Sequence, residues 1–165
     1  MELLIVRHAI ALERDTNRWP DDEERPLSAR GMARARKAAL GLKALSAAPN
    51  RVLTSPLLRA AQTAAILAQV AGWPKATLCR QLMPGIAPRE LLTVLGRTRE
   101  DRVAVVGHEP GLSALLAACL PAGLGGAAFA FRKMGVALLE FQGAPRAGRG
   151  QLIWFLPPRL LRAVR

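Results

Sequence analysis

Short apolar runs that alternate with helical patterns are the feature that most restricts the fold of this chain of 165 residues. Leu3–Val6 is a continuous apolar run, typical of a strand buried on both faces of a sheet, and Arg102–Val106 is the clearest strand pattern. Two shorter strands are expected at 51–54 and 76–79. Strands that alternate with helices form a mostly parallel sheet with helices on both faces.

The expected helices begin at recognisable start signals. Ser28 is placed to cap a helix over 29–44. The inner face of this helix is expected to carry five apolar residues: Met32, Ala35, Ala39, Leu42 and Leu45. Ser55 as N-cap and Pro56 as first helical residue indicate a second helix that reaches about Ala71. Two shorter helices are expected, at 89–95 and 111–120.

The C-terminal part changes character. Gly135–Phe141 and Gln151–Phe155 flank a turn-rich segment at 143–150, which predicts an antiparallel hairpin. Half of all residues (51%) are apolar and 22% are charged, which excludes a disordered chain. The sequence therefore predicts one α/β domain over 1–165, a three-layer α/β/α sandwich whose central sheet is mostly parallel and carries the hairpin at its end.

The sequence shows no secretory signal pattern, and one uncharged stretch imitates a membrane span. The first seven residues lack a basic region, and proline and glycine interrupt the uncharged stretch from Gly111 to Phe131, so we expect there a buried helix followed by a loop. Cys79 and Cys119 lie far apart without a metal-ligand pattern, which favours buried thiols in a reducing compartment. We expect a cytoplasmic protein.

Positive charges outnumber negative charges two to one. The chain has 24 Lys and Arg, of which 20 are Arg, against 12 Asp and Glu, and a formal net charge of +12. Such a surface attracts phosphorylated substrates, acidic proteins or nucleic acid, and charge alone does not distinguish them. Aromatic residues make up only 4%, without tyrosine, and no zinc-finger or RNP pattern is present, so nucleic acid is the least favoured partner.

The two histidines of the chain occupy equivalent positions. His8 follows the strand at 3–6, and His108 follows the strand at 102–106. Ligands of open α/β sheets bind just beyond the carboxyl ends of the strands, so the two imidazoles are expected to meet in one crevice. A single histidine would more simply be a core residue with a satisfied ring, but two at equivalent strand ends favour a shared site.

Two arginines are expected at the same edge. Arg7 ends a buried strand, where an unpaired guanidinium is costly and a phosphate suits its planar fork. Arg59 lies near the start of the second helix, where an anion is favoured, although for this residue alone a solvated surface arginine is the simpler interpretation. Two arginines and two histidines with no carboxylate between them predict a phosphate site and neither a metal nor a cofactor.

The order of these motifs resembles the histidine phosphatase superfamily, which has the phosphoglycerate mutase-like fold. The resemblance rests on four segments of this chain: Arg7-His8, Arg25-Pro26-Leu27-Ser28 with Gly31, Ser55-Pro56-Leu57-Leu58-Arg59-Ala60-Ala61-Gln62-Thr63, and Gly107-His108. The short length and the C-terminal hairpin are most similar to the compact bacterial phosphohistidine phosphatase branch. The resemblance covers nearly the whole chain.

The resemblance implies a role for each of four residues. His8 would be the nucleophile that takes the phosphoryl group as a phosphohistidine, and Arg7, Arg59 and His108 would bind the phosphoryl oxygens. These roles fit the chemistry, because His8 must be neutral at one nitrogen to attack, while the arginines and His108 supply positive charge where the transition state needs it.

The sequence departs from the family pattern in two ways. The usual Arg-His-Gly is Arg-His-Ala here, so Ala9 must avoid conformations reserved for glycine. The general acid of the phosphomonoesterase members has no obvious counterpart: Glu13, Asp15 and Glu109 are near in sequence, and Glu109 and Glu13 are the candidate proton donors, but no pattern fixes either one beside a leaving group.

The missing donor favours a substrate that needs little proton donation. An alkoxide needs a proton to leave, whereas a phosphorylated imidazole leaves more readily. The chain also has little room for an inserted cap, so an open cleft that admits a phosphorylated protein side chain is expected. We expect a metal-independent phosphatase that hydrolyses phosphohistidine, on a phosphoprotein. Two alternatives stay open: a phosphatase for small phosphomonoesters or nucleotides, and a non-catalytic protein that binds phosphate or polyanions.

Overall fold

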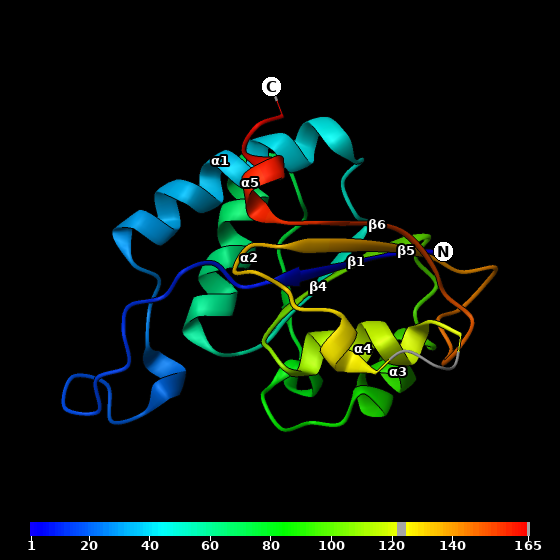
Figure 1. Cartoon of the computed structure of the whole chain (residues 1–165), viewed down its shortest axis with the longest axis horizontal. Helices are drawn as coiled ribbons and strands as arrows, with labels where there is room; N and C mark the ends of the chain where they lie inside the picture. Colours follow the sequence, from blue (N-terminus) through cyan, green and yellow to red (C-terminus); the bar gives the residue numbers. More distant parts are fainter. Residues whose placement is uncertain (122–124, 165) are drawn as a thin grey trace.

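A six-stranded sheet with strand order β3-β2-β4-β1-β5-β6 runs through the computed structural model, which describes residues 1–121 and 125–164 (Figure 1). The strands are β1 (Glu2–Arg7), β2 (Arg51–Thr54), β3 (Thr77–Leu78), β4 (Arg102–Gly107), β5 (Val136–Glu140) and β6 (Gln151–Leu156). The helices are η1 (Asp22–Glu24), α1 (Ala29–Leu45), α2 (Leu58–Ala71), η2 (Arg80–Leu82), α3 (Pro88–Leu95), α4 (Gly111–Cys119), η3 (Gly126–Ala128) and α5 (Pro158–Leu161).

The direction of the strands changes at β1. On one side β1 pairs in parallel with β4, which pairs in parallel with β2, and β2 in turn with β3. On the other side β1 pairs with β5, and β5 with β6, in antiparallel fashion. The predicted fold class, a mostly parallel sheet with an antiparallel C-terminal hairpin, is thus confirmed, and the four predicted strands and the hairpin are all present.

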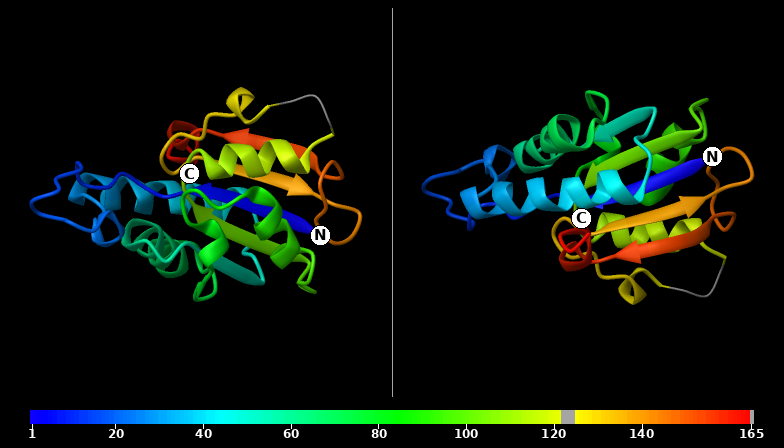
Figure 2. Two further views of the ribbon diagram at one scale, coloured as in Figure 1. Left: turned by 90° about the horizontal axis from the view of Figure 1, so that it is seen from below. Right: turned by 90° about the horizontal axis from the view of Figure 1, so that it is seen from above.

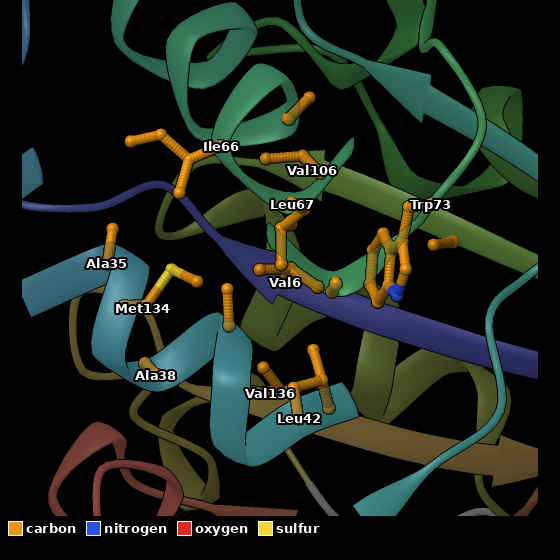
Figure 3. Close-up of a cluster of buried hydrophobic side chains, with 14 of the residues drawn as sticks. Val6, Ala35, Ala38, Leu42, Ile66, Leu67, Trp73, Val106, Met134 and Val136 are labelled. Atoms are coloured by element: carbon orange, nitrogen blue, oxygen red, sulfur yellow. The ribbon is translucent and has the colours of Figure 1, made fainter. Parts of the chain in front are cut away.

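Alternate residues of the central strands face two separate cores. Leu4 and Val6 of β1 pack with α1, α2 and α5, while Leu3 and Ile5 pack with α3 and α4. Figure 2 shows α3 and α4 over one face of the sheet and α1 and α5 over the other. Figure 3 shows part of the first core, in which Val6 lies near Leu67 of α2. The predicted three layers are therefore present.

The inner face of α1 differs from the expected stripe. Ser28 caps the helix as predicted, since its hydroxyl accepts a hydrogen bond from the Gly31 N–H at 3.0 Å. Met32 and Leu45, however, are 38% and 44% exposed, so their assignment to the buried face was wrong. The buried face instead includes Gly31 and Gly41, which carry no side chain and are invisible to a pattern of apolar residues.

The start of α2 also differs from its prediction. The helix begins at Leu58 with Leu57 in the N-cap position, so Ser55 is not the N-cap and Pro56 is not the first helical residue. Ser55 instead accepts a hydrogen bond from the Leu57 N–H at 3.3 Å. The Ser-Pro pattern indicated the correct turn but placed the start of the helix two residues too early. Because Ser55 does not cap the helix, its hydroxyl is available to the end of the neighbouring strand.

The uncharged stretch after β4 is a helix followed by a loop, as predicted. Helix α4 ends at Cys119, and residues 122–124 of the loop lie outside the described part of the chain. Cys79 and Cys119 are both free and buried. Within residues 1–121 and 125–164, no helix has the length and apolar character needed to cross a membrane.

Candidate functional site

The two histidines lie side by side at the carboxyl edge of the parallel strands. The register of β1 and β4 places Arg7 opposite Gly107, and the His8 N–H donates to the Gly107 carbonyl at 3.0 Å. The residue that follows each strand is therefore a neighbour of the other, and the ring centroids of His8 and His108 are 4.9 Å apart. Both side chains are buried, at 6% and 5% exposure.

A hydrogen bond to the backbone determines which ring nitrogen of His8 carries the proton. Nδ1 lies 2.7 Å from the carbonyl oxygen of Ala9, and because a carbonyl can only accept, Nδ1 carries the proton. The lone pair of the neutral ring then belongs to Nε2. Burial, followed by the nearby His108, Arg59 and Arg7, lowers the pKa of His8 to about 3, and only the hydrogen bond to Ala9 opposes this shift. His8 is therefore a neutral imidazole over the ordinary pH range.

His108 is also neutral in this structure. Burial, followed by the charges of Arg59 and Arg7, lowers its pKa to about 3. Its Nε2 lies 2.9 Å from the Ser55 hydroxyl, and when that hydroxyl donates, the proton of the ring sits on Nδ1. This shift runs against the expectation that His108 supplies positive charge, because burial and then the cations around the ring disfavour its protonation. With the Ser55 hydroxyl as the donor, the neutral ring of His108 offers its N–H at Nδ1.

Arg59 is deeply buried, at 5% exposure, and not a solvated surface residue. Its Nη1 donates to the backbone oxygen of Asp22 at 2.7 Å, and its Nη2 forms an ion pair with the Asp22 carboxylate at 3.1 Å. The same carboxylate pairs with Arg25 at 2.7 Å. Burial lowers the pKa of Arg59, and Asp22 opposes this shift. Helix η1 thus holds the guanidinium in place from the projecting segment between β1 and α1 (Figures 1 and 2).

Arg7 is held from the opposite direction. Its Nη1 donates to the Phe131 carbonyl at 2.5 Å, and burial lowers its pKa, with Glu109 as the main opposing charge. Glu109 accepts hydrogen bonds from the Phe131 N–H at 2.7 Å, from the Ser113 N–H at 3.1 Å and from the Ser113 hydroxyl at 2.6 Å. The carboxylate therefore joins the start of α4 to the segment that anchors Arg7.

The two candidate proton donors are placed differently. Glu109 lies near Arg7, and its oxygens are engaged as acceptors by the Ser113 N–H, the Ser113 hydroxyl and the Phe131 N–H. Glu13 is exposed in the segment between β1 and η1, beside Arg14 and Asp15. The structure brings Arg7, His8, Arg59 and His108 together, and leaves Glu13 on the surface.

Three buried nitrogens around His8 have no hydrogen-bond partner among the described residues: Arg7 Nε, Arg59 Nε and His108 Nδ1. Buried N–H groups are nearly always paired, so three unpaired nitrogens on residues that cluster with His8 suit a ligand with several acceptors. Two of them belong to cations, which suits an anion. No cluster of three or more His, Cys, Asp or Glu side chains is placed to hold a metal within the described ranges.

The sequence pattern contained further positioning residues whose roles were not recognised. The Thr63 hydroxyl donates to the Arg59 carbonyl at 2.7 Å and accepts from the Ala9 N–H at 3.0 Å, which ties α2 to the residue after His8. Gln62 accepts from the Leu27 N–H at 2.7 Å. Both residues belong to the motif that begins at Ser55, and their place in this motif is the only feature of the sequence that could have indicated their roles. No sequence pattern indicated that Asp22 pairs with Arg59.

Ala9 can occupy the position of the family's usual glycine because its backbone does not adopt a positive φ. Among the described non-glycine residues, a positive φ occurs at Met134 alone, at 69°. The Met134 N–H lies 3.1 Å from the Arg7 carbonyl and 3.2 Å from the His8 carbonyl, and supports the backbone that carries both side chains. The left-handed conformation thus belongs to the neighbouring chain segment, and Ala9 keeps a conformation open to any residue.

Comparisons with known proteins agree with this geometry. The sequence model of the histidine phosphatase superfamily (branch 1) matches residues 3–83. An uncharacterized protein of Picosynechococcus sp. is 38% identical over 119 residues, which cover 68% of each chain. The structure of the protein histidine phosphatase SixA complexed with tungstate is similar at a TM-score of 0.84 and 26% identity, and covers 98% of this chain and 99% of SixA.

A more distant structure shares the fold alone. The mycobacterial glucosyl-3-phosphoglycerate phosphatase with inorganic phosphate is 19% identical at a TM-score of 0.68, over 96% of this chain and 98% of that one. Together with the sequence match and the SixA structure, the paired strand-end residues and the α2 motif settle the family. The chain belongs to the histidine phosphatase superfamily.

Proposed function

We propose that this phosphatase hydrolyses phosphohistidine on a protein, without a metal ion, through a phosphohistidine intermediate on His8. The observation that carries the proposal is the set of three unpaired buried nitrogens on Arg7, Arg59 and His108, the residues that lie near His8, whose Nε2 is free. A phosphoryl group placed there supplies acceptors for all three and presents its phosphorus to the lone pair. The tungstate in the SixA structure is a tetrahedral oxyanion of the same kind.

In the first step His8 Nε2 attacks phosphorus, and the bond from phosphorus to the substrate nitrogen breaks. His8 keeps the proton on Nδ1 throughout, so the phosphorylated ring becomes a cation whose N–H still points at the Ala9 carbonyl. Arg7 and Arg59 stabilise the charge on the phosphoryl oxygens, and His108 contributes a neutral N–H. The substrate imidazole leaves with the electron pair of the broken bond.

In the second step water attacks the phosphorus of the intermediate. The bond to Nε2 breaks, the electron pair returns to His8, and the two water protons remain on the released phosphate or pass to solvent. Because the phosphorylated ring is already cationic, it leaves as a neutral imidazole and needs no general acid. His8 then returns to its starting tautomer with the Ala9 hydrogen bond intact.

The substrate preference follows from the leaving group. A phosphohistidine protonated at its other ring nitrogen leaves as neutral imidazole, whereas an alkoxide must receive a proton. Of the two candidate donors, Glu109 is engaged in three hydrogen bonds and Glu13 is exposed. This arrangement favours a phosphoramidate over an ester. The SixA relative, a protein histidine phosphatase, supports a protein as the carrier of the phosphoryl group.

The proposal is tested with a phosphohistidine peptide beside a panel of sugar phosphates and nucleotides. We expect phosphate release from the peptide with a kcat/KM at least tenfold above that of any ester. His8→Ala should abolish release, and rapid quenching of the wild type should trap an acid-labile phosphoryl group on His8. Arg30→Gln, an exposed residue of α1, serves as the control and should leave turnover unchanged.

Three results would overturn the proposal. Unchanged turnover by His8→Ala removes the nucleophile. A preference for esters moves the substrate to the small phosphomonoesters. Tight binding of phosphate without turnover of any substrate makes the protein a phosphate sensor.

A further inference from the structure

A second group of cations lines a cavity outside the catalytic cluster. The cavity has a volume of about 480 Å³, and five cationic side chains line it: Arg34, Arg132, Lys133, Arg159 and Arg162. No aspartate or glutamate is among its lining residues. We refer to this cavity, between α1, the segment before β5 and the start of α5, as the basic pocket.

The basic pocket lies along the same edge of the sheet as the catalytic cluster. Because β5 runs opposite to β1, and β6 opposite to β5, the chain leaves β6 at the edge where it leaves β1 (Figure 1). In register, Val6 pairs with Val136 and Val136 with Leu156, so Pro157 follows β6 at the level of Arg7. Two strand spacings of ~4.8 Å separate these ends, roughly 10 Å in all.

The pocket and the catalytic cluster share part of their backbone. Ala9 and Met134 line the pocket. The Ala9 carbonyl accepts the His8 Nδ1 proton, and the Met134 N–H donates to the carbonyls of Arg7 and His8. An anion in the pocket is thus separated from the reacting histidine by little more than the peptide segment after β1.

Within residues 1–121 and 125–164, no carboxylate pairs with the pocket cations. The described ion pairs of the chain use Arg25, Arg51, Arg59 and Arg102, and none of the five pocket cations. Burial, and then the charges of Arg7, Arg25 and Arg59, lower the pKa of Lys133, so this pocket residue lies within reach of the cations around the catalytic cluster. Like charges held together without a counter-ion attract an anion strongly.

We propose that the basic pocket binds a second anionic group of the substrate, a carboxylate or phosphate on the same molecule as the phosphoryl group that is transferred, at a spacing close to the roughly 10 Å between the ends of β1 and β6. The inference rests on the proposed function and deepens it. In an extended peptide at ~3.3 Å per residue, this distance corresponds to an acidic side chain about three residues from the phosphohistidine. A small molecule with two phosphates is the other source of the same chemistry.

The test compares two phosphohistidine peptides that differ at the positions three residues before and after the phosphohistidine, one with Glu and one with Gln. The double variant R34Q/R159Q removes two pocket charges. The matched control R30Q/R89Q removes the same net charge from exposed positions that do not line the pocket. A small bisphosphate whose phosphates lie about 10 Å apart forms a second arm beside the matching monophosphate.

We expect wild type to show a KM for the Glu peptide about tenfold below that for the Gln peptide, as two charge-assisted contacts allow. R34Q/R159Q should lose this difference at unchanged kcat, and R30Q/R89Q should keep it. A pocket-dependent KM for the bisphosphate alone would assign the second anion as a phosphate. Equal losses in both double variants, or no preference for Glu or for the bisphosphate, would overturn the proposal.

Binding of the unphosphorylated Glu and Gln peptides, measured by calorimetry, separates this inference from the proposed function. If wild type prefers the Glu peptide and R34Q/R159Q does not, the pocket binds anions even where no phosphohistidine is hydrolysed. If phosphohistidine is hydrolysed with no preference in either assay, the proposed function stands and the pocket proposal is wrong.

Discussion

The two cationic regions along one sheet edge are built in opposite ways. At the parallel strands, Arg59 is 5% exposed and fixed by Asp22, and Arg7 is anchored to the Phe131 carbonyl. At the hairpin, Arg132 and Arg159 are exposed, and neither takes part in an ion pair described for the chain. The first region holds donors at fixed positions, and the second offers charge on side chains that can move.

This difference separates two tasks that positive charge performs. A transition state gains from donors that are already in place, because no rearrangement is then needed during the reaction. An attached acidic group only has to be attracted, and exposed cations achieve this at longer range. We therefore expect changes at the buried region to act on kcat and changes at the exposed region to act on KM, which the following predictions examine in order of effect.

The largest effect is expected from Arg59→Lys. Lysine keeps the charge but cannot bond Asp22 with two nitrogens while it directs a third donor toward the phosphoryl oxygens, so kcat should fall about 100-fold. Arg159→Lys, the same substitution in the basic pocket, should change kcat and KM less than about twofold, because an exposed point charge suffices there. Steady-state kinetics measure both. Equal losses in the two variants would contradict the distinction.

Gly31 lies where the two regions meet, since it lines the basic pocket and packs on the backbone after β1. A Cβ at this position would lie 1.9 Å from the Ile10 carbonyl oxygen, which is backbone and cannot move cheaply. Gly31→Ala should therefore lower the free energy of unfolding by roughly 2–3 kcal/mol in urea denaturation.

The matched control for this change is Gly111→Ala at the start of α4. A Cβ there meets no atom within 4 Å, and this helical glycine has no positive φ. The substitution should leave stability within about 1 kcal/mol, or raise it slightly through helix propensity. If Gly31→Ala lowers the free energy of unfolding as little as Gly111→Ala does, α1 does not approach the segment after β1 as closely as described.

The pH dependence distinguishes the regions because only the buried one contains histidines. His8 and His108 have pKa values of about 3 in the folded protein, below the ordinary ~6.5 of the unfolded chain. Between pH 6.5 and 3 the unfolded chain binds protons that the folded chain excludes. The free energy of unfolding should therefore fall as the pH falls through this window, by at most roughly 1.4 kcal/mol per pH unit for each histidine.

The same shifts keep the nucleophile neutral, so kcat/KM should not decline at pH 6 as it would with an ordinary histidine. Proton NMR of an untagged protein gives a direct reading, because the chain has two histidines and each ring gives its own signal. Neither signal should titrate near pH 6.5. A transition there for His8 would contradict the burial and charge environment described for it.

The sequence predicted those features of the fold and of the site that depend on residues close together in the chain. Strand–helix alternation predicted the parallel sheet, and the positions of His8 and His108 after their strands predicted that the rings approach each other, which the register of β1 and β4 brings about. These features depend on residues next to each other in the chain. They needed only the rule that parallel strands end at one edge.

The sequence was uninformative where a contact joins distant segments with no repeated pattern. The ion pair between Asp22 and Arg59 joins the segment before α1 to helix α2. The backbone of α5 can approach Gly41 closely at Leu161 only because glycine has no side chain. The neutral state of His108 depends on burial together with charges from three segments, and no residue type signals it. Tertiary packing decided these features, and they include the parts that tune the site.

The smallest effect is expected from salt, and it acts on the exposed region. The screening length falls from about 10 Å at 0.1 M to about 3 Å at 1 M ionic strength. An anion attracted by the exposed side chains of the basic pocket should therefore be held less well, and KM for the Glu peptide should rise about threefold to fivefold over this range. The cations around His8 are buried and close to the transferred group, so kcat should change less than twofold. Because R34Q/R159Q lacks two of the five pocket charges that salt screens, its KM should vary less than that of the wild type. A kcat that falls as steeply as KM rises would show that the two regions do not divide the work as their burial indicates.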